Sequence, residues 1–224
     1  NEAMLTAKTG DWFTTNPQRG RSNNSALTIR DELTREEWAH IMKSVKDFGE
    51  PGFIFTEDEN FTFNPCVEIG MLPRTKDGRS GFQFCNLTEI NGGACNTVED
   101  FFRGCKASAI LGTIQAGYTN FKYVSSATKE ITDHEALLGC SITGWMNNPE
   151  ILFDKDNMIA GATLIKEVNK QVAAMLGINQ AARTTAVKPS GNASVLLGTA
   201  SGIHGEHSKR YFRHVQMNKL DEVA

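Results

Sequence analysis

The 224-residue chain carries 23 basic and 26 acidic residues, a formal net charge of −3 at pH 7, which argues against a general nucleic-acid-binding surface. Its apolar share of 40% and charged share of 22% are those of a soluble globular protein of one domain or two. No apolar run is long enough to span a membrane, and the first residues do not resemble a signal peptide, so we expect a cytoplasmic protein.

The first third of the chain predicts two strands around a helix. Residues 1–20 are polar, with a turn at Asn16-Pro17, and residues 25–29 suit a short strand. Thr34 and Glu37 have capping-box spacing and predict a helix to about Phe48, followed by a short buried strand at 53–55.

The rest of the chain alternates strands and helices. We expect an exposed turn at 73–80. After it, the predicted elements are a strand at 81–87, a helix from Thr97 to about Gly117, a helix at 134–146 capped by Asp133, a long helix at 156–176 and a strand at 183–187. This alternation predicts an α/β domain with mostly parallel strands.

Five cysteines occur, at positions 66, 85, 95, 105 and 140, without any C-x-x-C pair. The spacing argues against a zinc ribbon, and the odd number argues against a disulfide framework. We interpret Cys105 and Cys140 as small buried apolar residues in helical segments, while Cys95 follows a Gly-Gly-Ala run in a loop and has no assigned role.

Asn64, Cys66 and Glu68 alternate along a run that contains Pro65, which disfavours a regular helix and places the run on an extended segment or a loop. In an extended segment the three side chains would project from one face and combine an amide, a thiol and a carboxylate. The simpler alternative is an edge strand with a buried cysteine and a solvated glutamate.

The segment Lys188-Pro189-Ser190-Gly191-Asn192-Ala193-Ser194 follows a predicted strand and can begin a helix. Ser190 can cap that helix and Gly191 permits a close backbone approach, so the free N–H groups could bind phosphate. A plain turn between strand and helix is the alternative.

Four segments together resemble the ribonucleotide reductase large subunit, most closely its adenosylcobalamin-dependent (class II) branch. They are Asn64-Pro65-Cys66-Val67-Glu68-Ile69 with the later Cys85-Asn86-Leu87, the Pro189-Ser190 turn, Arg21-Ser22-Asn23-Asn24-Ser25-Ala26, and Ser201-Gly202-Ile203-His204-Gly205-Glu206-His207-Ser208. The resemblance extends from about residue 12 to residue 218. It implies part of a ten-stranded (β/α) barrel whose central finger loop carries the catalytic cysteine.

The resemblance implies a role for each matching residue. Cys66 matches the thiyl radical that abstracts the ribose 3′ hydrogen, Glu68 the base for the 3′-hydroxyl, and Asn64 the amide that binds the ribose. Cys85 matches one half of the cysteine pair that reduces the 2′ position. Ser190, Gly191, Asn192, Ala193 and Ser194 match the substrate phosphate site.

The chain departs from the family pattern, because no cysteine precedes Cys66 as a partner for Cys85 and no C-terminal cysteine pair follows. We therefore expect residues 1–224 to be one partial catalytic barrel domain, as a fragment, a split subunit or part of something longer. The resemblance implies adenosylcobalamin, or alternatively a diiron-type radical subunit. It also implies a ribonucleoside di- or triphosphate substrate, a thioredoxin-type reductant and the remaining part of the reductase or a second chain.

Two other functions remain open: a nucleotide-binding or assembly module of a split reductase, and a thiol oxidoreductase without radical chemistry, which the missing C-x-x-C disfavours. His204 and His207, with His214 further on, have a spacing compatible with metal binding. Because no further ligand is evident, we expect no metal there.

Overall fold

The computed structural model describes residues 2–206, 208 and 210–212. Its elements, in chain order, are α1 (Glu2–Leu5), α2 (Trp12–Thr15), η1 (Pro17–Arg21), β1 (Ser25–Ile29), α3 (Arg35–Phe48), β2 (Gly52–Thr56), β3 (Thr62–Phe63), β4 (Gly70–Met71), β5 (Asn86–Asn91), η2 (Gly92–Ala94), α4 (Val98–Ala116), α5 (Ser126–Glu135), β6 (Leu138–Thr143), η3 (Trp145–Asn147), α6 (Pro149–Leu152), α7 (Lys155–Leu176) and α8 (Gly191–Leu197). The α/β class with mostly parallel strands is confirmed, since β1 pairs with β2 and β5 with β6 in parallel.

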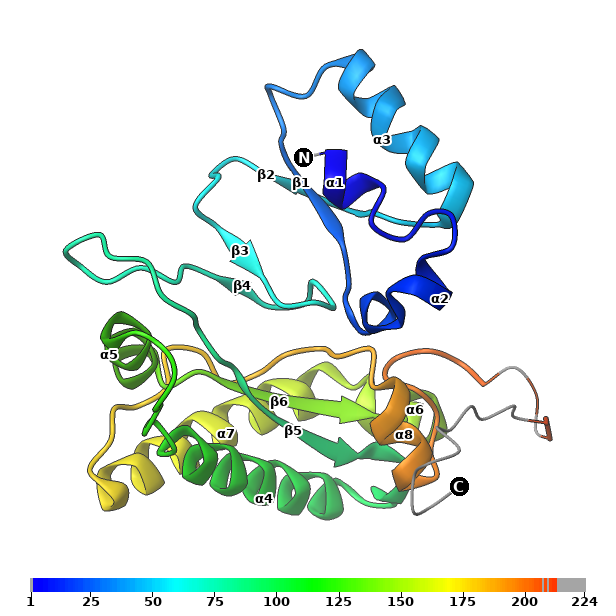
Figure 1. Ribbon diagram of the computed structural model, residues 1–224. Coiled ribbons are helices and arrows are strands. Elements are labelled where there is room, and N and C mark those ends of the chain that lie inside the picture. The colour runs from blue at the N-terminus through cyan, green and yellow to red at the C-terminus, as the bar shows by residue number, and fades with distance from the viewer. Residues whose placement is uncertain (1, 207, 209, 213–224) are drawn as a thin grey trace.

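The N-terminal part consists of the β1–β2 pair, α3 and the short helices before them (Figure 1). The predicted capping box at Thr34 is present, and its backbone and side-chain bonds begin α3 as expected. Trp38 of α3 packs on Phe53 at a ring-centroid distance of 4.9 Å. β2 is less buried than predicted, with Phe55 46% exposed. The first 20 residues contain short helices where only a turn was expected.

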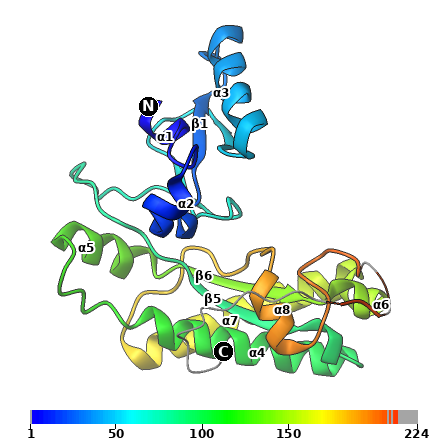
Figure 2. The ribbon, with the colours of Figure 1, turned by 45° about the vertical axis from the view of Figure 1, so that its right-hand side comes forward.

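The C-terminal part is a two-layer unit in which α4 and α7 lie together on one face of β5 and β6 (Figures 1 and 2). The main core fills this interface and includes Phe101, Cys105 and Ile165. Residues 183–187 continue the sheet beside β6 through a parallel bridge between Cys140 and Thr185. The predicted strand there therefore exists as a short pairing rather than as a regular element.

Alternation along β5 and β6 gives the sheet two different faces. Thr88 and Cys140 point to the helices, where Thr88 contacts Ser108 and Cys140 belongs to the core. Glu89 points the other way, since its carboxylate binds Ser190. Gly139 shares that second face, because a Cβ there would meet the Cys85 sulfur at 2.9 Å. The face away from α4 and α7 therefore carries the polar side chains, and we call it the site face.

Two predicted elements are wrong. The helix at 134–146 is instead the end of α5 followed by β6, and Asp133 lies inside α5, whose N-cap is Ser125. A short apolar run gives no period that separates a buried strand from a helix, and all six residues of β6 are buried. The strand predicted at 81–87 begins only at Asn86.

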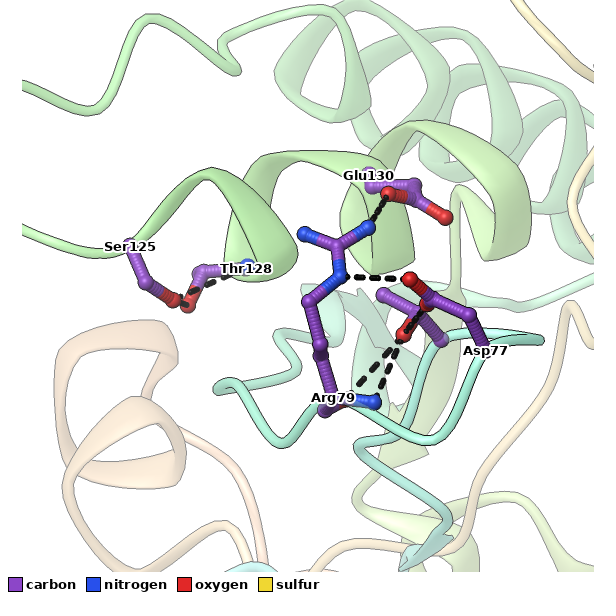
Figure 3. Close-up of polar contacts among 6 residues, drawn as sticks. Asp77, Arg79, Ser125, Thr128 and Glu130 are labelled. Atoms are coloured by element: carbon purple, nitrogen blue, oxygen red, sulfur yellow. Dashed lines mark hydrogen bonds and ion pairs between the residues drawn. The ribbon is translucent and has the colours of Figure 1, made fainter.

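Between the two parts, β3 and β4 form an antiparallel hairpin. The chain then makes the turn predicted at 73–80, which is closed by a bridge between Arg74 and Ser80. Arg79 binds Asp77 at 2.8 Å and Glu130 of α5 at 2.6 Å (Figure 3). Its guanidinium and the Thr75 hydroxyl lower the pKa of Asp77 to about 2. This contact ties the turn to α5.

The strands of the described residues form three separate two-stranded sheets rather than a closed barrel. None of the described helices has the length and apolar character that crossing a lipid bilayer requires.

Candidate functional site

The Asn64–Glu68 run forms the turn between β3 and β4, so of the two placements predicted for it, an extended segment or a loop, the structure has the loop. The Val67 amide donates to the Asn64 carbonyl at 2.9 Å, and Val67 has a φ of 64°. A left-handed residue reverses the chain direction and breaks the alternation of side chains. As a result Cys66 is exposed, whereas the Glu68 side chain is only 9% exposed.

Glu68 turns inward to an ion pair with Lys188, which is 120 residues further along the chain. Lys188 Nζ donates to Glu68 Oε1 at 2.9 Å, and the lysine side chain is 17% exposed. Glu68 Oε2 is also buried, and it accepts no hydrogen bond within the described residues. One oxygen of the carboxylate is thus held by the lysine while the other is free to accept a proton.

Opposing effects determine the charge of Glu68. Burial raises its pKa, but the hydrogen bond and charge of Lys188, with smaller effects from the nearby Asn64 side chain and the Glu68 backbone, outweigh burial, so that the pKa of Glu68 is lowered overall. The carboxylate is therefore ionised at neutral pH. Cys66 belongs to the same environment, since its charge contributes to a raised pKa of Lys188.

Cys85 lies at the start of the site face, immediately before β5, where the absence of a side chain at Gly139 leaves room for its sulfur. Burial, with smaller effects from the charges of Cys140 and Glu68, raises the pKa of Cys85 to about 12. The side chain is therefore a neutral thiol at physiological pH. The charges of Glu68 and Lys188 both act on Cys85, so the turn and the second cysteine share one electrostatic environment.

The helix predicted after Pro189 is confirmed as α8, but the predicted capping by the Ser190 hydroxyl is wrong. Ser190 has a φ of 54°, and its hydroxyl instead donates to the Glu89 carboxylate at 2.6 and 2.7 Å. Ser194 is buried, with its hydroxyl on the Gly191 carbonyl. Gly191 and Asn192 are exposed, and a Cβ on Gly191 would meet no atom within 4 Å.

The structure thus brings Glu68 to Lys188 and Ser190 to Glu89, and it places Cys66 and Cys85 in the electrostatic range of the first pair. Sequence reasoning missed the partners Lys188 and Glu89. For Glu89 a signal existed, because it follows Cys85 at an even spacing and therefore shares its face of the strand.

Histidine-based metal binding gains no support from the part of the chain that the structure describes, where no three His, Cys, Asp or Glu side chains gather as a ligand set. His207 and His214 lie outside the described residues. Cys105 and Cys140 are buried as predicted, although Cys140 lies on a strand; Cys95 is also buried.

Comparison with known proteins finds similarity to ribonucleotide reductases. No family model matches the chain. A probable adenosylcobalamin-dependent ribonucleoside-triphosphate reductase of Dictyostelium discoideum is 24% identical over 221 residues, covering 91% of this chain and 28% of the relative. The adenosylcobalamin-dependent ribonucleoside-triphosphate reductase of Euglena gracilis is 24% identical over 227 residues, covering 92% of this chain and 29% of the relative.

A crystal structure of a B12-dependent (class II) ribonucleotide reductase matches with a TM-score of 0.57 and 18% identity, over 91% of this chain and 33% of that one. The chain is similar, over most of its length, to these adenosylcobalamin-dependent ribonucleotide reductases. The family resemblance drawn from the four motifs is thereby confirmed. The chain spans less than a third of the length of the curated reductases it matches.

Replacement of Gly139 by alanine should destabilise the protein. The added methyl group would lie 2.5 Å from a Leu87 methyl carbon and 2.9 Å from the Cys85 sulfur, so both must move. We expect a loss of about 1–3 kcal/mol in the free energy of unfolding, measured by urea denaturation. Gly205→Ala, where the methyl group meets nothing, is the control. Equal stability of the two variants would contradict the close packing of Cys85 on the strand.

Proposed function

We propose that this chain takes part in the reduction of ribonucleotides to 2′-deoxyribonucleotides by a thiyl-radical mechanism, as part of a ribonucleotide reductase. The observation that carries the proposal is the Glu68 carboxylate, which is buried and ionised, with one oxygen on Lys188 and the other unpartnered. A buried carboxylate with a free oxygen beside an exposed thiol suits a base that acts on a hydroxyl next to a radical centre.

In the proposed reaction the Cys66 sulfur radical takes the hydrogen atom from the ribose 3′ carbon and becomes a thiol. Glu68 Oε2 accepts the proton of the 3′-hydroxyl and later returns it to the 3′ oxygen. The 2′-hydroxyl takes a proton from one thiol of the cysteine pair and leaves as water, and the other thiol supplies the hydrogen that replaces it at the 2′ carbon. Asn64 is assigned to the ribose hydroxyls, and its Oδ1 already accepts from the Ile69 amide at 3.0 Å, which holds the side chain in the turn. The hydrogen returns from Cys66 to the 3′ carbon at the end.

Reduction at the 2′ position consumes two electrons, which we assign to Cys85 and a second cysteine. The neutral state of the Cys85 thiol supports this role, because the thiol must deliver hydrogen as well as electrons. The two sulfurs would end as a disulfide, and a thioredoxin-type reductant would return them to thiols. The second cysteine would come from the remaining part of the reductase or from a second chain.

For the substrate phosphates we propose the beginning of α8, at Ser190, Gly191, Asn192, Ala193 and Ser194. The first N–H groups of a helix lack intrahelical acceptors, and the Ser190 hydroxyl does not cap them because it is bound to Glu89. The open surface over Gly191 leaves space for a di- or triphosphate group.

The two curated relatives are named for adenosylcobalamin, and we propose the same cofactor for this chain rather than a diiron-type radical subunit. When bound, it supplies the radical chemistry that activates Cys66. The exposed position of Cys66 at the tip of the turn fits this requirement, because its sulfur is accessible from outside the chain. We further propose that residues 1–224 are part of a ten-stranded (β/α) barrel and that the β3–β4 turn is its central finger loop.

A thiol oxidoreductase without radical chemistry is disfavoured by the site. Thiol–disulfide exchange requires a thiolate, and a pKa of about 12 leaves Cys85 almost entirely protonated at neutral pH. A nucleotide-binding or assembly module without its own activity is disfavoured by the buried, ionised Glu68, which phosphate binding alone does not require.

Cys66→Ser and Cys85→Ser should fail in different ways in the complete protein that contains this chain. A serine O–H bond is too strong to exchange hydrogen with the radical, so Cys66→Ser should abolish turnover and leave nucleotide binding nearly intact. Cys85→Ser should still permit 3′ abstraction but not reduction, so that the substrate breaks down and releases its base. Chromatographic assay of deoxynucleotide and free base separates these outcomes. Deoxynucleotide formation by Cys66→Ser would exclude the radical assignment.

Gly191→Val should weaken nucleotide binding by about tenfold or more, the loss that corresponds to ~1.4 kcal/mol. The Cβ of the valine would meet no atom of the protein within 4 Å, and its branched side chain would stand over the backbone, so a ligand close to the backbone should be affected. The measurement is a calorimetric titration with a ribonucleoside triphosphate, with Gly205→Val as the matched control. Unchanged affinity would place the phosphate site elsewhere.

A further inference from the structure

We propose that Lys188 is a positioning residue for the Glu68 carboxylate: it binds Oε1, and it thereby presents Oε2 to the substrate. The contact on which this rests is the bond of 2.9 Å from Lys188 Nζ to Glu68 Oε1. The inference rests on the proposed function, because it concerns how the base of that reaction is held.

Lys188 is itself held firmly enough to position another residue. Its backbone amide donates to the Ser141 hydroxyl on β6 at 3.1 Å, and Pro189, which follows it, restricts the backbone of Lys188. One residue further on, the Ser190 hydroxyl is bound to the Glu89 carboxylate on β5. The lysine therefore projects from a segment that is anchored on both sides to the site face of the sheet.

Glu68 lies on a turn whose own hydrogen bonds, from the Val67 amide to the Asn64 carbonyl and from the Ile69 amide to Asn64 Oδ1, stay within the turn and do not reach the sheet. The turn contains Val67 in the left-handed region, where β-branched residues are strained, so a contact from outside must hold the conformation. Among the described hydrogen bonds and ion pairs, the bond from Lys188 is the one that joins the Asn64–Glu68 side chains to the sheet. Lys188 thus determines where the carboxylate lies.

The two oxygens of the Glu68 carboxylate differ in their hydrogen bonding, although both are removed from water. Oε1 is satisfied by the ammonium group, whereas Oε2 is buried without a partner, which is costly unless a ligand supplies one. A substrate hydroxyl that donates to Oε2 would remove this cost. Were both oxygens on Lys188, no atom would be free to act as the base.

The charges around Glu68 and Lys188 also favour an ionised carboxylate held by a charged lysine. The titratable groups around Glu68 are Lys188, Cys66, Cys85 and, through the lysine, Glu89. Burial lowers the pKa of Lys188, but its contacts with Glu68 and the charges of Cys66 and Glu89 raise it overall. The raised pKa keeps Lys188 charged at neutral pH, and its ammonium group favours the ionised state of Glu68.

Lys188→Met tests the inference without any assay of the reaction. Loss of the ammonium removes both the hydrogen bond and the charge of Lys188, and it leaves burial opposed by Asn64 and the Glu68 backbone, so the pKa of Glu68 should rise. The measurement is an NMR titration of the side-chain carboxyl carbon, assigned with Glu68→Gln. Lys188→Arg should restore a lowered pKa, and Lys170→Met, at an exposed position on α7, should change nothing. An unchanged Glu68 pKa in Lys188→Met would overturn the assignment.

The pH dependence of deoxynucleotide formation by the complete protein then tests the role in the reaction. The acidic limb of the kcat/KM profile should move to higher pH in Lys188→Met, since a higher fraction of Glu68 is protonated there, while nucleotide affinity stays within about twofold. A raised Glu68 pKa with an unmoved acidic limb would refute the positioning role. If the unmodified protein forms no deoxynucleotide, the proposed function fails, but the carboxyl titration still decides whether Lys188 controls Glu68.

Discussion

The ion pair between Glu68 and Lys188 is the contact on which the arrangement of the site depends. It joins a hairpin turn to the end of a parallel sheet across 120 residues of sequence. Both side chains are largely removed from water, at 9% and 17% exposure, so desolvation offsets much of their attraction. Such a pair contributes little net stability, and its value lies in placing one carboxylate oxygen at the lysine and leaving the other free.

The second constraint is the alternation of β5 and β6. The residues that face α4 and α7 form the core, which includes Cys105 and Cys140, whereas the opposite face carries Glu89, Ser141 and the space for Cys85. The alternation of side chains along a strand thereby directs Cys140 into the core and leaves room for the Cys85 sulfur on the site face. It also explains why Ser190 binds Glu89: the strand presents that carboxylate directly to the segment after Pro189.

Local signals made much of the fold predictable. The capping boxes at Thr34 and Thr97 and the left-handed glycine after α7 gave α3, α4 and α7 nearly to the residue, because caps depend on neighbours in sequence. β6 was not predictable in this way. Its identity as a strand depends on burial between β5 and residues 183–187, which no local period records.

The residues of the candidate site could be predicted from the sequence, but their arrangement in space could not. The motifs identified Asn64, Cys66, Glu68, Cys85 and the Ser190 segment, and their roles remain predictions. The run was expected on an extended segment or a loop, and it is a turn, in which Val67 adopts a left-handed conformation that its residue type disfavours. That the three side chains share one face stays a prediction. The contacts of Lys188 with Glu68 and of Glu89 with Ser190 were missed, because they join residues more than a hundred positions apart; the spacing from Cys85 indicates only which face Glu89 occupies, not its partner.

The central claim is that the turn is held on the sheet by the Glu68–Lys188 contact. A double-mutant cycle of Glu68→Gln, Lys188→Met and the double variant, read as free energies of unfolding in urea, tests it most directly. If the pair is formed, either single change leaves the other group buried without its partner, and the two effects should fail to add by about 1–3 kcal/mol. Additive effects, with a coupling below about 0.5 kcal/mol, would contradict the account.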